Sequence, residues 1–325
     1  MIITETLKRR FVKDTNLPIK VFDEPYFSHF LDLYEEHFNA KTLWEMFLKE
    51  LEQYEHESDY LQEYNRVKDA AITYLAENPE MQYFCQQEDM NKFNVQNTGL
   101  PASTVFKETL VGHTLLSIDM KRANFSALRH YNPAIVGGKE TYEEFIGMFT
   151  DSEYMKRSKY IRQVIFGNQN PRRQTKYEQY LMDLVLTKFL EFELFTKSMV
   201  VYFGTDEIVF DISEIAGHKD LISFVDSVLN WAAENNIRIR GEHYRLLRIR
   251  GTSGYMKDFV YPSLDKNFEI KSASGIEMPY IIRSLKNESP EDMDGVFVYE
   301  GLMARLVEPL RIYFSNKPKN EETSQ

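Results

Sequence analysis

Hydrophobic residues in the first hundred positions recur at three- and four-residue steps, the spacing of helices that bury one face. The pattern begins after Pro25, a residue suited to the first turn of a helix, and runs to about Phe38. It continues over 42–54 and 60–75, with acidic residues on the outer faces. We therefore expect residues 1–100 to form a mostly helical N-terminal domain.

The pattern changes near residue 100, where the stretch QNTGLP is rich in turn-forming residues and predicts a domain boundary. Short runs of β-branched and aromatic residues then alternate with two amphipathic segments and end in a basic, alternating segment. The runs that predict strands are 114–119, 199–203, 208–212 and 237–250, the last of which is either one long strand or a hairpin. The segments that predict helices are 176–197 and 219–236.

The resulting order is strand, helix, strand, strand, helix, strand. It predicts an α+β fold with a four-stranded antiparallel sheet and helices on one face, which is the split βαβ (ferredoxin-like) arrangement. This domain would span 101–270 and carry a basic helical insertion at 122–175. We expect a C-terminal α/β appendage at 271–314 and a disordered, polar tail at 315–325, starting as early as the residue after Arg311.

Composition and charge narrow the class of protein. The 325 residues carry a net charge of −11, contain a single cysteine and include no long apolar run. A disulfide framework, a cysteine zinc cluster and a protein that coats DNA or a membrane are therefore excluded. We expect a cytoplasmic protein that does not engage a membrane. The composition, rich in Lys, Asn and Tyr, suggests a large phage or virus, so the compartment would be the host cytoplasm.

Acidic residues stand at two predicted strand ends. Asp119 is the last residue of the first strand, and Asp206 and Glu207 occupy the turn of the hairpin. In the split βαβ arrangement these strands are neighbours, so the carboxylates would converge and either share protons or hold Mg²⁺. A pair of such ions (Mg²⁺ or Mn²⁺) can clamp a phosphoryl group in transfer, with Glu207 or Asp211 as an accessory ligand. The plainer alternatives are a helix N-cap for Asp119 and ordinary hairpin-tip residues for the other two.

These segments resemble the palm domain of template-dependent polymerases. The stretch 119–126 (DMKRANFS) resembles the first palm motif of reverse transcriptases, and 205–210 (TDEIVF) resembles the metal-binding hairpin of reverse transcriptases and B-family DNA polymerases. Between them, 162–168 (RQVIFGN) is similar to the B-family helix whose lysine meets the incoming triphosphate. The resemblance covers about 112–250 in the right order, and it implies a divergent, short palm with metal ligands at Asp119 and Asp206.

The chain departs from the family pattern at four positions. Gly204 stands where B-family enzymes have an aspartate, and Glu207 replaces the second aspartate of reverse transcriptases. Arg162 replaces the lysine of the middle motif, which keeps the charge and changes its geometry. Asn124 stands where the family has the aromatic residue that screens the sugar 2′ position. The chain is also too short for a full replicative polymerase.

Positive charge concentrates in two places. Residues 156–176 contain seven cations and no acidic side chain, among them Lys156, Lys159 and Arg162, which at three-residue steps would share a helix face suited to a triphosphate. Within the same stretch, we expect Arg172 and Arg173 to contact nucleic acid. A second strip is expected to line a primer-duplex groove and consists of Arg238, Arg240, Arg248 and Arg250. The alternatives are a solvated helix balanced by the acidic N-terminal domain and a charged edge strand.

The leading hypothesis is a palm-type nucleotidyltransferase that adds nucleotides to the 3′ end of DNA or RNA. It requires Asp119 and Asp206 to meet at one edge of a single sheet, with neither buried in a salt link with arginine. The implied partners are a nucleoside triphosphate, a nucleic acid and a protein bound by the acidic N-terminal domain. The rival is a catalytically lapsed palm that binds nucleic acid or docks on a replication complex, and a third reading is a structural or virion protein with accidental motif matches.

Overall fold

The computed structural model describes residues 2–167, 169–260 and 267–317. The first hundred residues form helices packed around aromatic side chains. Phe11 lies against Trp44 and Phe47, with ring centroids 4.8 and 5.6 Å apart. The elements of this part are α1 (Glu5–Thr15), α2 (Tyr26–Phe38), α3 (Ala40–Leu51), α4 (Glu57–Glu77), α5 (Pro79–Gln86) and the 3₁₀ turn η1 (Met90–Lys92).

An antiparallel sheet of seven strands forms the second part of the described chain. Its strands run in the order β2-β3-β1-β4-β5-β6, and β9 pairs with the far end of β4. The strands are β1 (Thr114–Met120), β2 (Val200–Phe203), β3 (Glu207–Asp211), β4 (Ile239–Arg250), β5 (Tyr255–Phe259), β6 (Phe268–Lys271) and β9 (Tyr313–Ser315). The predicted α+β class with an antiparallel sheet is confirmed, but the predicted sheet of four strands lacks β5, β6 and β9.

The remaining elements of the described chain fall into three groups along the sequence. The insertion between β1 and α10 contains α6 (Ala123–Tyr131), η3 (Pro133–Val136), α7 (Tyr142–Ile146), α8 (Glu153–Arg157) and α9 (Lys159–Gly167). The helices between the strands are α10 (Pro171–Leu190) and α11 (Leu221–Glu234), and short 3₁₀ turns stand at η2 (Glu108–Leu110) and η4 (Lys197–Met199). The C-terminal elements are α12 (Met278–Leu285), η5 (Asp292–Gly295) and the hairpin β7 (Val296–Tyr299) and β8 (Leu302–Arg305).

Two of the predicted boundaries are wrong. The helix predicted to reach residue 197 ends at Leu190, because the chain turns back to place the Phe195 ring 4.9 Å from that of Phe189. Side chains six residues apart do not meet on a continuous helix. Strand β9 runs across the predicted start of the disordered tail, with Tyr313 and Phe314 in the predicted α/β appendage and Ser315 in the tail; residues 318–325 lie outside the described residues.

The two faces of the sheet differ in chemistry, because side chains alternate along each strand. Ile118 points toward α11 and belongs to the main core, while Leu115 points to the other face and joins a smaller core with Val209 and Tyr244. Further along that second face of β1 stand Ser117 and Asp119. The second face is therefore apolar at one end and polar where β1 ends.

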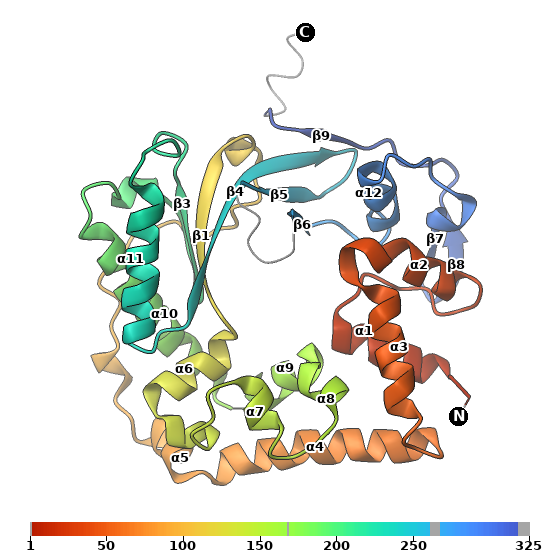
Figure 1. Cartoon of the computed structure of the whole chain (residues 1–325), viewed down its shortest axis with the longest axis horizontal. Coiled ribbons are helices and arrows are strands. Elements are labelled where there is room, and N and C mark those ends of the chain that lie inside the picture. Colours follow the sequence, from red (N-terminus) through yellow and green to blue (C-terminus); the bar gives the residue numbers. More distant parts are fainter. Residues whose placement is uncertain (1, 168, 261–266, 318–325) are drawn as a thin grey trace.

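The N-terminal helices also contact the C-terminal segment, so that the elements close into a ring in Figure 1. Asp294 in η5 is 1% exposed; its Oδ1 lies 2.8 Å from Nε2 of His29 on α2, and its Oδ2 accepts a hydrogen bond from Arg283 Nε at 3.0 Å. In this view α8 and α9 lie on the side of the ring opposite the sheet. The sequence pattern did not predict this closure.

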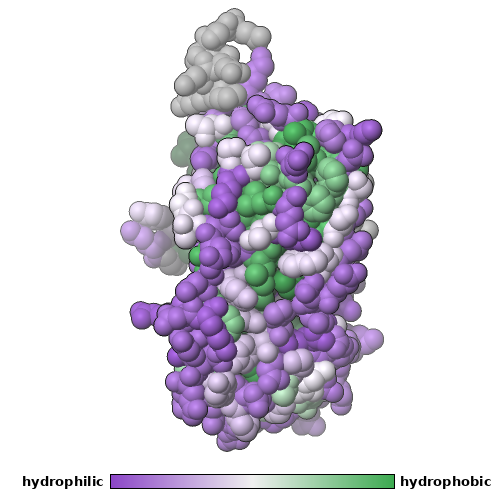
Figure 2. Space-filling model, turned by 90° about the vertical axis from the view of Figure 1, so that its left-hand side faces the viewer, coloured by the Kyte–Doolittle hydropathy of each residue, from purple (hydrophilic) through white to green (hydrophobic). Residues whose placement is uncertain are grey.

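The surface over α10 and α11 is mixed. Figure 2 shows this side, with apolar residues gathered on its upper half and polar residues predominating below. On α11, Ile222 is 51% exposed, and its neighbours Phe224 and Val225 are half-buried. None of the described helices combines the length and apolar character that a membrane crossing requires.

Asn78 ties the N-terminal helices to the insertion. Its side-chain oxygen accepts hydrogen bonds from the backbone N–H groups of Glu80 and Met81 at 2.9 and 3.2 Å, and its amide donates to the carbonyl of Ala134 at 2.9 Å. We expect Asn78→Ala to lower the free energy of unfolding by about 1–2 kcal/mol, the usual effect of losing an N-cap. Urea unfolding measures it, with Asn78→Asp, which retains the cap, as the control. Equal losses in the two variants would contradict the capping role.

Candidate active site at the end of strand β1

The two acidic segments, far apart in the sequence, meet at one edge of the sheet. Asp119 on β1 lies directly opposite Glu207 on β3 in the antiparallel register. One residue on, the backbone N–H of Met120 donates to the carbonyl oxygen of Asp206 at 2.8 Å. The hairpin turn that carries Asp206 is therefore fixed beside the end of β1.

The carboxylates at this edge influence one another's ionisation. Burial raises the pKa of Asp119 to about 6; nearby Arg240 opposes the rise, whereas Glu207 and Asp206 add to it. Burial, together with the charge of Glu207, also raises the pKa of Asp206. Each carboxylate thus disfavours the ionised form of its neighbour, which is the situation that a bound cation relieves.

Two side chains supply positive charge to this cluster. Arg240 Nε donates to Asp119 Oδ2 at 2.8 Å, with the two side chains 47% and 24% exposed, so Asp119 is in a half-buried salt link with arginine. Lys257 on β5 is nearly buried and lies 2.9 Å from Glu242 and 3.7 Å from Glu207. The hydroxyl of Ser117 donates to Glu207 Oε1 at 2.5 Å. Neither Arg240 nor Lys257 contacts Asp206.

Glu178 on α10 is a further acidic residue beside the cluster, and the sequence analysis missed it. It is 3% exposed and accepts a hydrogen bond from Asn124 Nδ2 at 2.8 Å. Burial, and then the charge of Asp206, raise the pKa of Glu178 to about 7. A signal existed in the sequence: Glu178 lies three and seven residues before the core residues Leu181 and Val185, which places a carboxylate on the apolar face of the helix.

Two sequence expectations for these acidic residues are wrong. Asp119 does not cap the following helix, because the N-cap of α6 is Arg122 in a left-handed conformation and no side chain caps it. Asp211 is not an accessory ligand, because it lies opposite Leu115, four residues or about 13 Å along the strand from the Asp119 pair. There it binds Ser213 and lies 2.7 Å from Nδ1 of His113.

The donor set at the sheet edge consists of hard oxygen ligands, the type that Mg²⁺ prefers. Among the residues that the structure describes, however, three or more His, Cys, Asp or Glu side chains nowhere gather closely enough to hold a metal ion. The predicted metal-binding set of three carboxylates, Asp119, Asp206 and Glu207, is therefore not assembled, and the oxygen donors that remain at the end of β1 are those of Asp119 and Asp206.

The predicted basic helix face is divided between two helices. Lys156 lies on α8 and pairs with Glu153 at 2.8 Å, whereas Lys159 and Arg162 lie on α9. Ser158 separates the helices, because its hydroxyl oxygen accepts the backbone N–H of Ile161 at 3.0 Å and so caps α9. The prediction of a single helix face is therefore wrong, and only the two α9 cations remain together.

Arg172 and Arg173 open helix α10 but differ in their surroundings. Arg172 is exposed. Arg173 Nη1 donates to the backbone carbonyls of Phe84 and Glu88 at 2.8 and 2.7 Å, which anchors the N-terminal helices. Only Arg172 is therefore available to an external phosphate without breaking an internal contact.

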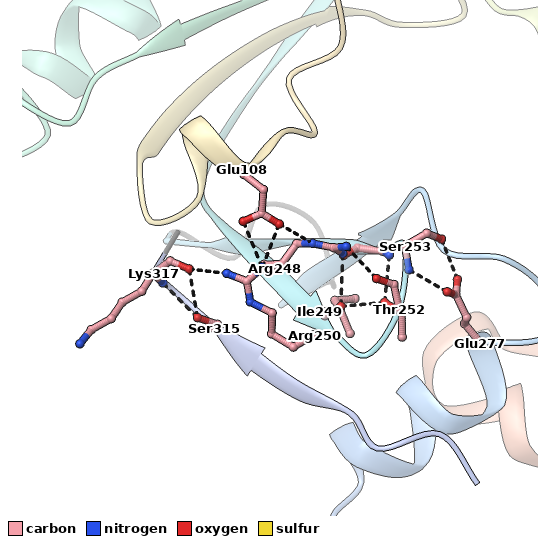
Figure 3. A network of polar contacts seen from close by, with 10 residues as sticks. Glu108, Arg248, Ile249, Arg250, Thr252, Ser253, Glu277, Ser315 and Lys317 are labelled. Atoms are coloured by element: carbon pink, nitrogen blue, oxygen red, sulfur yellow. Dashed lines mark hydrogen bonds and ion pairs between the residues drawn. The ribbon is translucent and has the colours of Figure 1, made fainter. Parts of the chain in front are cut away.

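Three arginines of the second predicted strip bind carboxylates of this chain away from the acidic cluster. Arg238 lies 2.7 Å from Glu140. At the other end of β4, Arg248 and Arg250 converge on Glu108, at 2.9 and 2.8 Å, as Figure 3 shows. Arg250 is 8% exposed, so its ion pair with Glu108 holds η2 against the sheet.

Comparisons of this chain with protein-family models, with curated proteins and with solved structures found no match.

Proposed function

We propose that this protein is a palm-type nucleotidyltransferase that adds nucleotides to the 3′ end of a nucleic acid. The observation that carries the proposal is the meeting of Asp119 and Asp206 at one sheet edge. The strand order β2-β3-β1-β4 supports it, because with α10 and α11 as the two connecting helices it is the order of the split βαβ arrangement.

Asp119 and Asp206 would hold Mg²⁺ or Mn²⁺, and Glu207, which Ser117 and Lys257 already contact, would add negative charge beside the metal. The bound metal supplies charge stabilisation for the transferring phosphoryl group. For the metal to bind, Arg240 must leave Asp119. The Arg240 side chain is 47% exposed and can turn into solvent, so a divalent cation can take its place beside Asp119. Arg240 would then be free to face the phosphates.

Substrate contacts would come from Asn124 beside the cluster and from the cations of α8, α9 and α10. Asn124 donates one amide hydrogen to Glu178, so the amide oxygen of Asn124 is left for a different partner. Our candidate for this partner is the sugar of the incoming nucleotide. Lys159 and Arg162 would neutralise the triphosphate, and Lys156 would contribute only after leaving Glu153. The nucleic acid would approach along Arg172. The acidic N-terminal helices remain our candidate surface for a protein partner.

The test is an extension assay with labelled nucleotides, Mg²⁺ or Mn²⁺, and primer-template substrates of DNA and of RNA. The proposal expects extension by the wild type that depends on the divalent cation and is lost in Asp206→Asn. If the wild type and the variant are equally inert on all substrates, the enzyme hypothesis is wrong.

A lapsed palm that binds nucleic acid is the second candidate, and the ion pairs favour it. Arg240 and Lys257 already neutralise Asp119 and Glu207, so the cluster is partly compensated without metal. A protein that only binds nucleic acid needs its cationic side chains for binding and does not need the carboxylates of the cluster.

Measuring the affinity of single variants for DNA shows which cationic side chains contribute to nucleic-acid binding. We expect Arg172→Gln to weaken binding to single- and double-stranded DNA about equally and to lower the slope of log affinity against log salt by about one. Fluorescence anisotropy over a salt series measures both quantities. Lys49→Gln, which removes an exposed cation on α3, is the control. If its affinity for DNA and its salt slope change as much as those of Arg172→Gln, Arg172 does not mark a specific binding surface for the nucleic acid.

A further inference from the structure

A pocket of about 270 Å³ lies where α1 and α3 meet the junction of α8 and α9. The acidic residues of the candidate active site do not line it. Arg157, Lys159 and Arg162 stand on one side, and Leu43 and Met46 form an apolar wall. It thus combines positive charge with a non-polar surface at the contact between the N-terminal helices and the insertion.

The three cations of the pocket form no ion pair with a carboxylate in the part of the chain that the structure describes, unlike the neighbouring Lys156. Burial lowers the pKa of Lys159, and the charges of Arg162 and Lys271 lower it further, while Glu269 opposes the shift. Burial and Arg122 lower the pKa of Arg162, and Tyr142 and Glu143 oppose that shift. Lys159 and Arg162 are half-buried and repel one another, so an anion that joins them is favourable.

Asp14 is the one carboxylate that lines the pocket, and it is already occupied. It is 3% exposed and accepts hydrogen bonds from the hydroxyls of Tyr64, Ser158 and Tyr154 at 2.5, 2.7 and 3.2 Å. Burial raises its pKa to about 6, and the three hydroxyls and the charge of Arg10 oppose the rise. Asp14 is therefore bound by groups other than the three cations of the pocket, which remain able to contact an external anion.

We propose that this pocket binds a phosphate-bearing ligand the size of a nucleoside monophosphate. The phosphate would lie against Arg157, Lys159 and Arg162 near the first turn of α9, where the helix dipole adds positive potential. The non-polar part of the ligand would lie on Leu43 and Met46. Binding of this kind does not depend on nucleotidyl transfer, and it would couple the N-terminal helices to α9.

Calorimetric titration of the full chain with AMP, and with adenosine as the ligand that lacks the phosphate, tests the proposal. We expect AMP to bind at least about tenfold more tightly than adenosine, because each charge-assisted hydrogen bond contributes about that factor. Arg157→Gln, at an exposed position that the fold tolerates, should weaken AMP about tenfold. Arg311→Gln, an exposed arginine outside the pocket, should leave the affinity unchanged.

The phosphate could belong to the substrate of the proposed reaction or to a separate ligand, and two further arms distinguish these sources. If the phosphate is that of the substrate, ATP displaces AMP, and either EDTA or the Asp119→Asn substitution lowers the affinity for ATP. If the ligand is separate, AMP binds equally well in EDTA and in Asp119→Asn, and ATP does not displace it. The pocket assignment is overturned if AMP binds no better than adenosine, or if Arg157→Gln and Arg311→Gln behave alike.

Discussion

Replacing Asp206 with Asn is expected to lower the rate of nucleotide addition by more than about 100-fold, beyond the 10–100-fold loss typical of residues that only support a metal ligand. Asp206 is the acidic residue of the cluster that neither Arg240 nor Lys257 contacts, so its charge is the one most available to a divalent cation. Single-turnover extension in saturating Mg²⁺ measures the effect.

The fold should survive this change. Burial and Glu207 raise the pKa of Asp206, so its ionised form is already unfavourable in the folded state, and the neutral amide removes that cost. Asp211→Asn is the matched control, because it alters the carboxylate at the opposite end of β3. If Asp211→Asn lowers extension as much as Asp206→Asn, the loss does not come from the proposed site.

Replacing Glu178 with Gln is expected to stabilise the protein by about 3 kcal/mol at pH 8. The pKa of Glu178 is raised from 4.5 to about 7 in the folded state, and one pKa unit corresponds to about 1.4 kcal/mol. The folded state therefore binds this proton more tightly than the unfolded chain does. The resulting stability is complete below pH 4.5 and is lost as the pH rises toward 7. Glutamine does not ionise and keeps an oxygen for Asn124.

Urea unfolding at two pH values measures the effect. The gap between Glu178→Gln and wild type should shrink to about 1 kcal/mol at pH 5, where the folded wild type already holds the proton. Glu234→Gln, at an exposed position on α11, should change stability little at either pH. A variant less stable than wild type at pH 8, or a gap independent of pH, would show that burial does not hold this proton. A buried carboxylate that destabilises the fold is typical of a site kept for function.

The strands that position the candidate site could be predicted because their apolar runs are short, rich in β-branched residues and separated by a clear turn. The register that sets Asp119 opposite Glu207 follows once β1 and the hairpin are neighbours. Strands β5 and β6 were not predicted, because each is only four or five residues long and carries charges, so their place depends on pairing with β4.

The ionic contacts could not be predicted, because they join residues far apart in the chain. Arg240 is 121 residues from Asp119, and a basic strand alone does not reveal which of its arginines face carboxylates. The break between α8 and α9 has a similar cause. Ser158 caps α9 while its hydroxyl donates to Asp14, 144 residues away, and three-residue spacing among the neighbouring cations gives no sign of it.

The central claim is that Asp119 and Asp206 share a divalent cation, and anomalous scattering from Mn²⁺ tests it most directly. Crystals would be grown with Mn²⁺ and a non-hydrolysable nucleoside triphosphate. We predict an anomalous peak bonded to a carboxylate oxygen of each residue, at about 2.0–2.6 Å, with Arg240 moved away from Asp119. A crystal without that peak, in which Arg240 still holds Asp119, would contradict the claim.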